Sequence, residues 1–141
     1  MDEETREGVC IIDLDTVMPG LVIYDFGDSI RFGANHSAED EKDLSKVNLD
    51  VDLFSVYTAA FLEGAGGSLT NEEIEYLPWG AKLMTLECGI RFLTDYLDGD
   101  HYFHISREAQ NLDRCRTQFK LVSDMEAHWA ELEAIVRQYQ K

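Results

Sequence analysis

The amino-terminal part of the chain carries short apolar runs that are typical of strands. Residues Val9–Leu14 read Val-Cys-Ile-Ile-Asp-Leu, a run with β-branched side chains that predicts a buried strand. After the break at Pro19-Gly20, residues Leu21–Tyr24 predict a second short extended piece. Asp25 then has the residue type and the place of an amino-terminal helix cap.

Beyond that point the pattern predicts helices. The polar segment Asn35–Asn48 reads as an exposed loop, and a helix follows it from about Val51 to Glu63. Thr70-Asn-Glu-Glu73 has the capping-box pattern that begins a short helix. Pro78 favours the start of a longer helix that Gly99 ends, and a last helix is expected from about Ser106 towards Tyr139. Apolar side chains of the longer helix recur at alternating spacings of three and four, as in a helix core: Leu83, Leu86, Ile90, Leu93 and Leu97.

Composition fits one acidic globular domain over residues 1–141. Of its 141 residues 45% are hydrophobic, and 28 acids against 12 bases give a formal charge of −16. Such a surface repels phosphate backbones and anionic lipids, so we expect no nucleic-acid or membrane partner. An acidic chain can still bind ATP in the presence of Mg²⁺, because carboxylates bind the metal and the metal binds the phosphates.

The cysteines and the start of the chain indicate a reducing compartment. Cys10, Cys88 and Cys115 are widely spaced and form no C-x-x-C pair, which indicates reduced core thiols. The residues after Met1 are acidic and do not resemble a signal peptide, and no stretch has the length of a membrane span. We therefore expect a cytoplasmic protein.

Two carboxylates at the end of the first predicted strand carry the most informative chemistry. Asp13 and Asp15 are two residues apart, so in an extended strand both side chains lie on one face, as two oxygen ligands of one hard cation would. The pattern is also compatible with a simple strand end and turn. It matches the Asp-x-Asp-x-Thr/Val motif of haloacid-dehalogenase-type phosphatases as well. Those enzymes need a doubly wound sheet, whereas the rest of this chain predicts helices.

Three longer stretches of the sequence, the first of which begins at Asp13, carry a more specific resemblance than the Asp-x-Asp pair alone. They are Asp13-Leu-Asp-Thr-Val-Met-Pro-Gly-Leu-Val-Ile-Tyr-Asp-Phe-Gly-Asp-Ser-Ile-Arg-Phe32, Arg91-Phe-Leu-Thr-Asp-Tyr-Leu-Asp-Gly-Asp-His-Tyr-Phe103 and Asn111-Leu-Asp-Arg-Cys-Arg-Thr-Gln118. Together they resemble the aminoglycoside phosphotransferase and choline kinase-like superfamily, and within it the N-acetylhexosamine 1-kinase branch. The resemblance implies a mainly α fold, the helical carboxy-terminal subdomain of a protein-kinase-like fold with one or two short amino-terminal strands. Residues 8–25 would form the strand and metal-binding segment, and residues 26–141 the helical subdomain.

The resemblance also implies roles in phosphate chemistry. Asp13 would be a Mg²⁺ ligand that joins the metal to the ATP phosphates, and Asp15 would assist as a second ligand or through water. Asp25 would stabilise the catalytic loop by hydrogen bonding, as a structural partner rather than a reactant.

Other residues would belong to the substrate pocket. The resemblance places Arg91 and Tyr102 there, where a guanidinium and a phenol can hold sugar hydroxyls or an acetamido group. Asp95 lies one helical turn from Arg91 and would orient it. From the residues alone, Arg91 and Asp95 also fit an exposed i, i+4 ion pair, and Tyr102 also fits a core aromatic.

The parts of a kinase that carry the reaction are absent from this sequence. It has no His-x-Asp-x-x-x-x-Asn loop for a catalytic base and no glycine-rich nucleotide loop. We therefore expect the carboxy-terminal portion of an ATP-dependent phosphotransferase that acts on an N-acetylhexosamine-like sugar. It would be inactive alone, would bind neither Mg²⁺ nor ATP tightly, and would need a missing amino-terminal lobe as its partner. A free edge on the early strand would favour a homodimer.

Two further interpretations stay open. The chain would also fit a non-catalytic acidic helical interaction module in which the Asp-x-Asp pair has no metal role. Relatives in the sugar-kinase group are sometimes labelled mucin desulfatases, but the Cys/Ser-x-Pro-x-Arg segment that sulfatases modify for catalysis is absent here.

Overall fold

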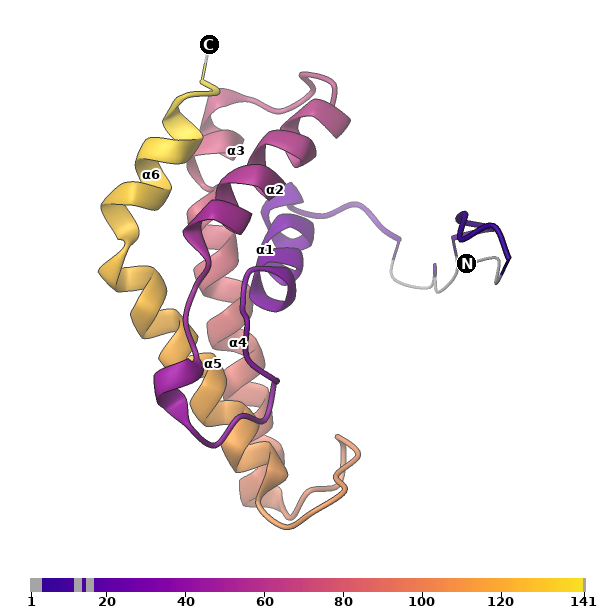
Figure 1. Cartoon of the computed structure of the whole chain (residues 1–141), viewed down its shortest axis with the longest axis vertical. Coiled ribbons are helices and arrows are strands. Elements are labelled where there is room, and N and C mark those ends of the chain that lie inside the picture. The colour runs from indigo at the N-terminus through magenta and orange to yellow at the C-terminus, as the bar shows by residue number, and fades with distance from the viewer. Residues whose placement is uncertain (1–3, 12–13, 15–16, 141) are drawn as a thin grey trace.

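The computed structural model describes residues 4–11, 14 and 17–140, whose helices pack around one core (Figure 1). Within these residues the only extended pairing is an isolated antiparallel bridge between Asn35 and Leu49. No helix in the described part of the chain is long and apolar enough to cross a membrane. The prediction of a mainly α fold is confirmed. The elements are α1 (Val22–Gly33), the 3-10 helix η1 (Leu44–Lys46), α2 (Val51–Gly64), α3 (Asn71–Glu75), α4 (Leu77–Asp98), α5 (Gln110–Ala127) and α6 (Trp129–Arg137).

The predicted strand Val9–Leu14 is not seen. Its described residues are exposed coil, and Figure 1 shows residues 4–11 apart from the helices. Val9 is 66% exposed and Ile11 84%, while Ile12 and Asp13 lie outside the described residues. A strand is stable only when a neighbour satisfies its backbone groups, and the described chain offers this segment no neighbouring strand.

The second predicted strand and the predicted helix cap are wrong. Helix α1 begins at Val22, so Leu21–Tyr24 is mostly helical, and Leu21 holds the cap position without a side-chain hydrogen bond. Asp25 lies exposed in the first turn instead of capping it. The extra helical turn places Ile23 against the core beside Phe26, and this tertiary packing outweighs the weak strand preference of the local sequence.

Helix α4 is the central element, and both α1 and α5 pack along it (Figure 1). Glycines make the α1–α4 contact close. A Cβ atom on Gly27 of α1 would lie 2.3 Å from the carbonyl oxygen of Gly80 on α4, and one on Gly80 would lie 2.3 Å from the carbonyl oxygen of Ile23. Gly89 has the same role on the other side, where its Cβ would lie 2.7 Å from the ring of Phe119 on α5. The two helices can approach α4 this closely because these positions carry no side chain.

An aromatic cluster joins α1 to α2. The ring of Phe26 is fully buried and lies 5.6 Å from Phe54 and 5.3 Å from Phe61, edge-on to both. These separations are in the favourable range for aromatic pairs. After α2 in the chain, Thr70 and Glu73 form the predicted capping box at the start of α3. The predicted bounds of α2 and of the long helix α4 agree with the structure to within a residue, and Gly99 ends α4 with a φ of 103°.

The last predicted helix is two helices. Residues before Gln110 form a loop, α5 ends at Ala127, and α6 starts at Trp129 after the break at His128. The ring of Trp129 packs 4.8 Å from that of Trp79 on α4. The change of direction lets α6 reach α2 and α3 and close the core.

The apolar stripe predicted as the core of α4 faces outward. Leu83 is 46% exposed, Ile90 50% and Leu97 74%. The opposite face of α4 is the buried one, and it is built from small and mixed residues that include Ala81, Thr85 and Gly89. The prediction was wrong because spacing shows only that side chains share a face, while the close approach of α1 and α5 requires the face that carries Gly80 and Gly89.

The three cysteines differ in their exposure to solvent. Cys115 is buried and Cys88 is half-buried, and burial raises the pKa of both thiols. Cys10 is exposed in the amino-terminal segment. The prediction of core thiols therefore holds for Cys115 and is wrong for Cys10.

Candidate functional site

The carboxyl end of α4 and the loop that follows it form a pocket of about 320 Å³. Residues 99–109 leave the helix at Gly99 and Asp100, both in the left-handed backbone region, and double back along α4. This return places the loop residue Tyr102 beside Arg91, two turns or more back along the helix. The pocket is lined by Arg91, Thr94, Asp95, Asp98, Tyr102 and Phe103.

Asp95 fixes the loop rather than Arg91. One carboxylate oxygen accepts hydrogen bonds from the backbone N–H groups of His101 at 3.0 Å and Tyr102 at 2.8 Å. The other accepts from the backbone N–H of Phe103 at 2.9 Å and from the side-chain amide of Asn111 at 2.9 Å. Asp95 is only 6% exposed, so these donors replace the water that the carboxylate loses. Burial opposes its ionisation, but the N–H groups of Phe103, Tyr102 and His101 outweigh burial and lower the pKa of Asp95.

Arg91 and Tyr102 form the wall of the pocket. A guanidinium nitrogen of Arg91 donates to the Tyr102 hydroxyl oxygen at 3.4 Å. The guanidinium carbon lies 5.5 Å from the ring centre of Tyr102 and 5.4 Å from that of Phe103, within cation–π range. Its ion-pair partner is Glu87, at 3.7 Å. The expected orientation of Arg91 by Asp95 is therefore not the arrangement observed, because the Asp95 oxygens are engaged with the loop.

Both pocket side chains remain accessible to a ligand. Tyr102 is 74% exposed, so it is not the core aromatic that the local sequence also allowed. The Arg91 side chain is 48% exposed. A guanidinium offers N–H donors and a phenol can both donate and accept, so the pair suits a neutral polar ligand with oxygen acceptors.

A second cavity of about 620 Å³ adjoins the first and shares Arg91 and Phe103 with it. Arg31 and Arg114 also line this cavity, and each is paired with an acid. Arg31 contacts Asp28 at 3.0 Å and Glu39 at 3.2 Å, and the Arg114 Nε lies 3.5 Å from Glu39. The charges of this cavity are therefore largely balanced within the protein.

The two predicted metal ligands, Asp13 and Asp15, fall outside the described residues. Their expected Mg²⁺ site therefore stays a prediction. Asp25 is described and is exposed on α1. Within the described part of the chain, no group of three or more His, Cys, Asp or Glu side chains could hold a metal ion.

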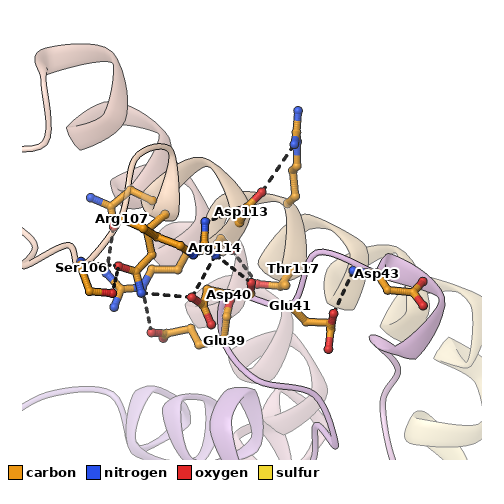
Figure 2. Close-up of polar contacts among 12 residues, drawn as sticks. Glu39, Asp40, Glu41, Asp43, Ser106, Arg107, Asp113, Arg114 and Thr117 are labelled. Carbon is orange, nitrogen blue, oxygen red and sulfur yellow. Dashed lines mark hydrogen bonds and ion pairs between the residues drawn. The ribbon is translucent and has the colours of Figure 1, made fainter.

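The acidic segment 39–43 before η1, which we call the anchored segment, is held on the fold by residues far away in the chain. Figure 2 shows Asp40 facing Arg107, whose guanidinium donates to the Asp40 carboxylate at 3.0 Å and to Asp113 at 2.6 Å. Thr117 of α5 donates to the backbone oxygen of Glu39. Burial opposes the ionisation of Asp40, but hydrogen bonds from Arg107 and Gln110 lower its pKa. The segment Asn35–Asn48 is therefore held on α5, and the prediction of a solvated loop was wrong for these acids.

The local sequence holds no signal for these contacts because Asp40 and Arg107 are 67 residues apart. The anchored segment also positions Glu39 against Arg31 and Arg114, and so forms one side of the second cavity.

No protein-family model matches the chain.

Proposed function

We propose that this chain forms the substrate-binding helical part of an ATP-dependent phosphotransferase that acts on a hydroxyl of an N-acetylhexosamine-like sugar. The observation that supports this most is the contact between Arg91 and Tyr102. The motif resemblance implies a substrate-binding role for both residues, and their side chains meet at the wall of a cavity, which supports the proposal.

The chemistry of the pocket suits a sugar with an acetamido group. Arg91 can donate to the amide carbonyl or to a ring hydroxyl, and the Tyr102 hydroxyl can donate or accept. The rings of Tyr102 and Phe103 lie 4.8 Å apart, edge to face, and offer apolar surface to the C–H groups of a sugar ring. The volume of about 320 Å³ is at the lower end of the range for small-molecule sites.

The metal site, the catalytic base and the nucleotide loop would lie outside the pocket. Asp13 and Asp15 would hold Mg²⁺, which offsets charge on the transferred phosphoryl group, and Asp25 would support the catalytic loop. The catalytic base and the nucleotide loop would come from an amino-terminal lobe. The chain alone would then bind sugar weakly and transfer no phosphate.

A titration of the ¹⁵N-labelled chain with N-acetylglucosamine, followed by NMR, tests the proposal. We expect shifts in the amides of residues 99–104 and in the Arg91 side chain, with weaker shifts for glucose, which lacks the acetamido group. Tyr102→Phe should reduce the response several-fold, whereas Tyr139→Phe, a matched change at another partly exposed tyrosine, should leave it intact. A response that is absent, or that is equal in both variants, would contradict the assignment of this pocket.

The DNA directly upstream of Met1 gives an independent test of the catalytic part. An in-frame region that encodes a glycine-rich or Lys-bearing strand and a His-x-Asp-x-x-x-x-Asn loop would support the phosphotransferase. A stop codon with no separate partner gene would count against it.

One observation favours a second candidate function, a non-catalytic interaction module. It is the exposed apolar face of α4, which a monomer has no reason to keep uncovered. A module of this kind would show no sugar response in the NMR titration. The phosphatase alternative gains no support from the fold, because it requires a doubly wound sheet and the described residues form none.

A further inference from the structure

The exposed face of α4 has the spacing of a coiled-coil seam. Its apolar side chains follow one another at intervals of four, three, four, three and four residues, the a and d positions of a heptad repeat. We call this set the α4 seam: Trp79, Leu83, Leu86, Ile90, Leu93 and Leu97. A period of about 3.5 residues keeps such a row facing a partner helix along its whole length.

The seam lies opposite the face that α4 buries in its own fold. The buried face holds Leu77, Ala81, Thr85 and Gly89, so α1 and α5 leave the seam exposed, and Trp79 at its start packs against another helix, through Trp129 of α6. Trp79, Leu83, Ile90 and Leu97 are between 46% and 74% exposed, and Leu86 and Leu93 are half-buried. We estimate about 500 Å² of exposed apolar surface in one row, near the upper range of patches on monomeric proteins.

We propose that the α4 seam pairs with the α4 seam of a second copy of this chain, in a parallel and in-register dimer. Charges beside the seam favour this occupant. With Leu83 at position a and Leu86 at position d, Lys82 is at position g and Glu87 at position e. In a parallel pair, each g residue lies near the e residue five positions on in the partner, so Lys82 meets the partner's Glu87 twice by symmetry.

The contacts that Lys82 and Glu87 make within the chain leave room for this pairing. The Lys82 ammonium lies 2.6 Å from Glu126 and over the rings of Trp79 and Trp129, at 5.4 and 5.6 Å. An ammonium has three N–H donors, so it can bond to a second carboxylate without losing Glu126. Glu87 is 48% exposed and its contact with Arg91 is long, at 3.7 Å. In an antiparallel pair, position e faces e, and Glu87 would lose this partner.

The surface is of the size that a weak dimer needs. Two seams of about 500 Å² bury about 1,000 Å² together, the lower limit for a specific interface. We therefore expect association in the micromolar range rather than an obligate dimer. The seam contains neither Arg91 nor Tyr102, so the inference goes beyond the proposed function. The dimer could be disproved while the proposed sugar site remains supported.

Sedimentation equilibrium of the whole chain over a range of concentrations tests the pairing. Wild type should self-associate, and Ile90→Lys should raise the dissociation constant about tenfold or more, because it places two charges at one layer of the seam. Phe32→Lys is the matched control: Phe32 is 74% exposed on α1, away from the seam. Circular dichroism would verify that both variants fold. A chain that is monomeric at all concentrations, or that associates equally well as Ile90→Lys, would overturn the proposal.

The register needs its own test. In a parallel in-register dimer, position 90 lies opposite position 90 of the partner, so Ile90→Cys should form a disulfide-linked dimer on oxidation. The background should be Cys10→Ser, because Cys10 is exposed, and Phe32→Cys should not cross-link in this way. Glu87→Lys should weaken association several-fold, whereas Glu108→Lys, the same charge change at an exposed loop residue, should not. Loss of association in Ile90→Lys without cross-linking of Ile90→Cys would overturn the parallel register.

Discussion

The crossing of α1 and α4 gives the sharpest test of the fold. We predict that Gly27→Ala destabilises the protein although alanine is the better helix former. A Cβ atom at residue 27 would lie 2.3 Å from the carbonyl oxygen of Gly80 and 2.5 Å from its carbonyl carbon. Both are backbone atoms of another helix and cannot rotate away, so α1 would have to move by about 1 Å to restore ordinary contact distances.

The expected size of the effect follows from two opposed terms. Alanine in place of glycine gains about 1 kcal/mol of helix propensity. Overpacking of a close contact typically costs about 1–3 kcal/mol, and the upper end applies here because α1 also carries the buried side chains Phe26 and Ile30. We expect a net loss of about 2 kcal/mol in the free energy of unfolding, and a decrease of about 6 °C in Tm.

Urea denaturation of two matched variants measures this difference. Gly33→Ala lies on the same helix, but a Cβ atom at residue 33 would meet nothing within 4 Å. This control should therefore leave the protein as stable as wild type, or stabilise it by up to about 1 kcal/mol. If Gly27→Ala were as stable as Gly33→Ala, the close approach of α1 and α4 would be refuted.

Three further changes test the hydrogen bonds between Asp95 and the loop after α4, a helix cap and the core. Because the pKa of Asp95 is lowered by the fold, its contribution to stability is present above the unfolded carboxyl pKa and is lost as the pH falls through the folded value. Asp95→Asn should therefore reduce the urea midpoint at neutral pH more than at about pH 3, and should speed hydrogen exchange of the amides of residues 101–103. Thr70→Ala removes the capping-box hydroxyl of α3 and should cost about 1 kcal/mol in urea denaturation. Phe26→Ala empties the centre of the aromatic cluster and should cost about 3–5 kcal/mol by the same assay.

Local features of the fold could be predicted from the sequence. The capping box at Thr70 and the helix end at Gly99 depend on residues within one turn, and both appear as predicted. The helix start at Asp25 was wrong because α1 gains an extra turn by packing Ile23 against the core, and local residue preferences contain no term for that contact.

Non-local features could not be predicted in this way. The i, i+4 spacing suggested that Asp95 orients Arg91, yet its oxygens accept backbone N–H groups of a loop that returns only because Gly99 and Asp100 turn the chain. The anchoring of Asp40 by Arg107 depends on segments 67 residues apart. In both cases the sequence shows a carboxylate, but only the fold decides which donors reach it.

Helix α4 carries both the seam and side chains of the candidate pocket. Glycines at residues 80 and 89 let α1 and α5 pack closely against two sides of the helix, which leaves the seam on the free face and Arg91 beside that face. Because Thr94 lines the pocket and is at an e position beside Leu93, a partner helix on the seam would run along the rim of the pocket. Pairing would then limit access to the pocket from that side without touching Arg91 or Tyr102. Ile90→Lys should therefore leave the sugar response of the monomer unchanged, while wild type at high concentration should show a slower exchange of the bound sugar.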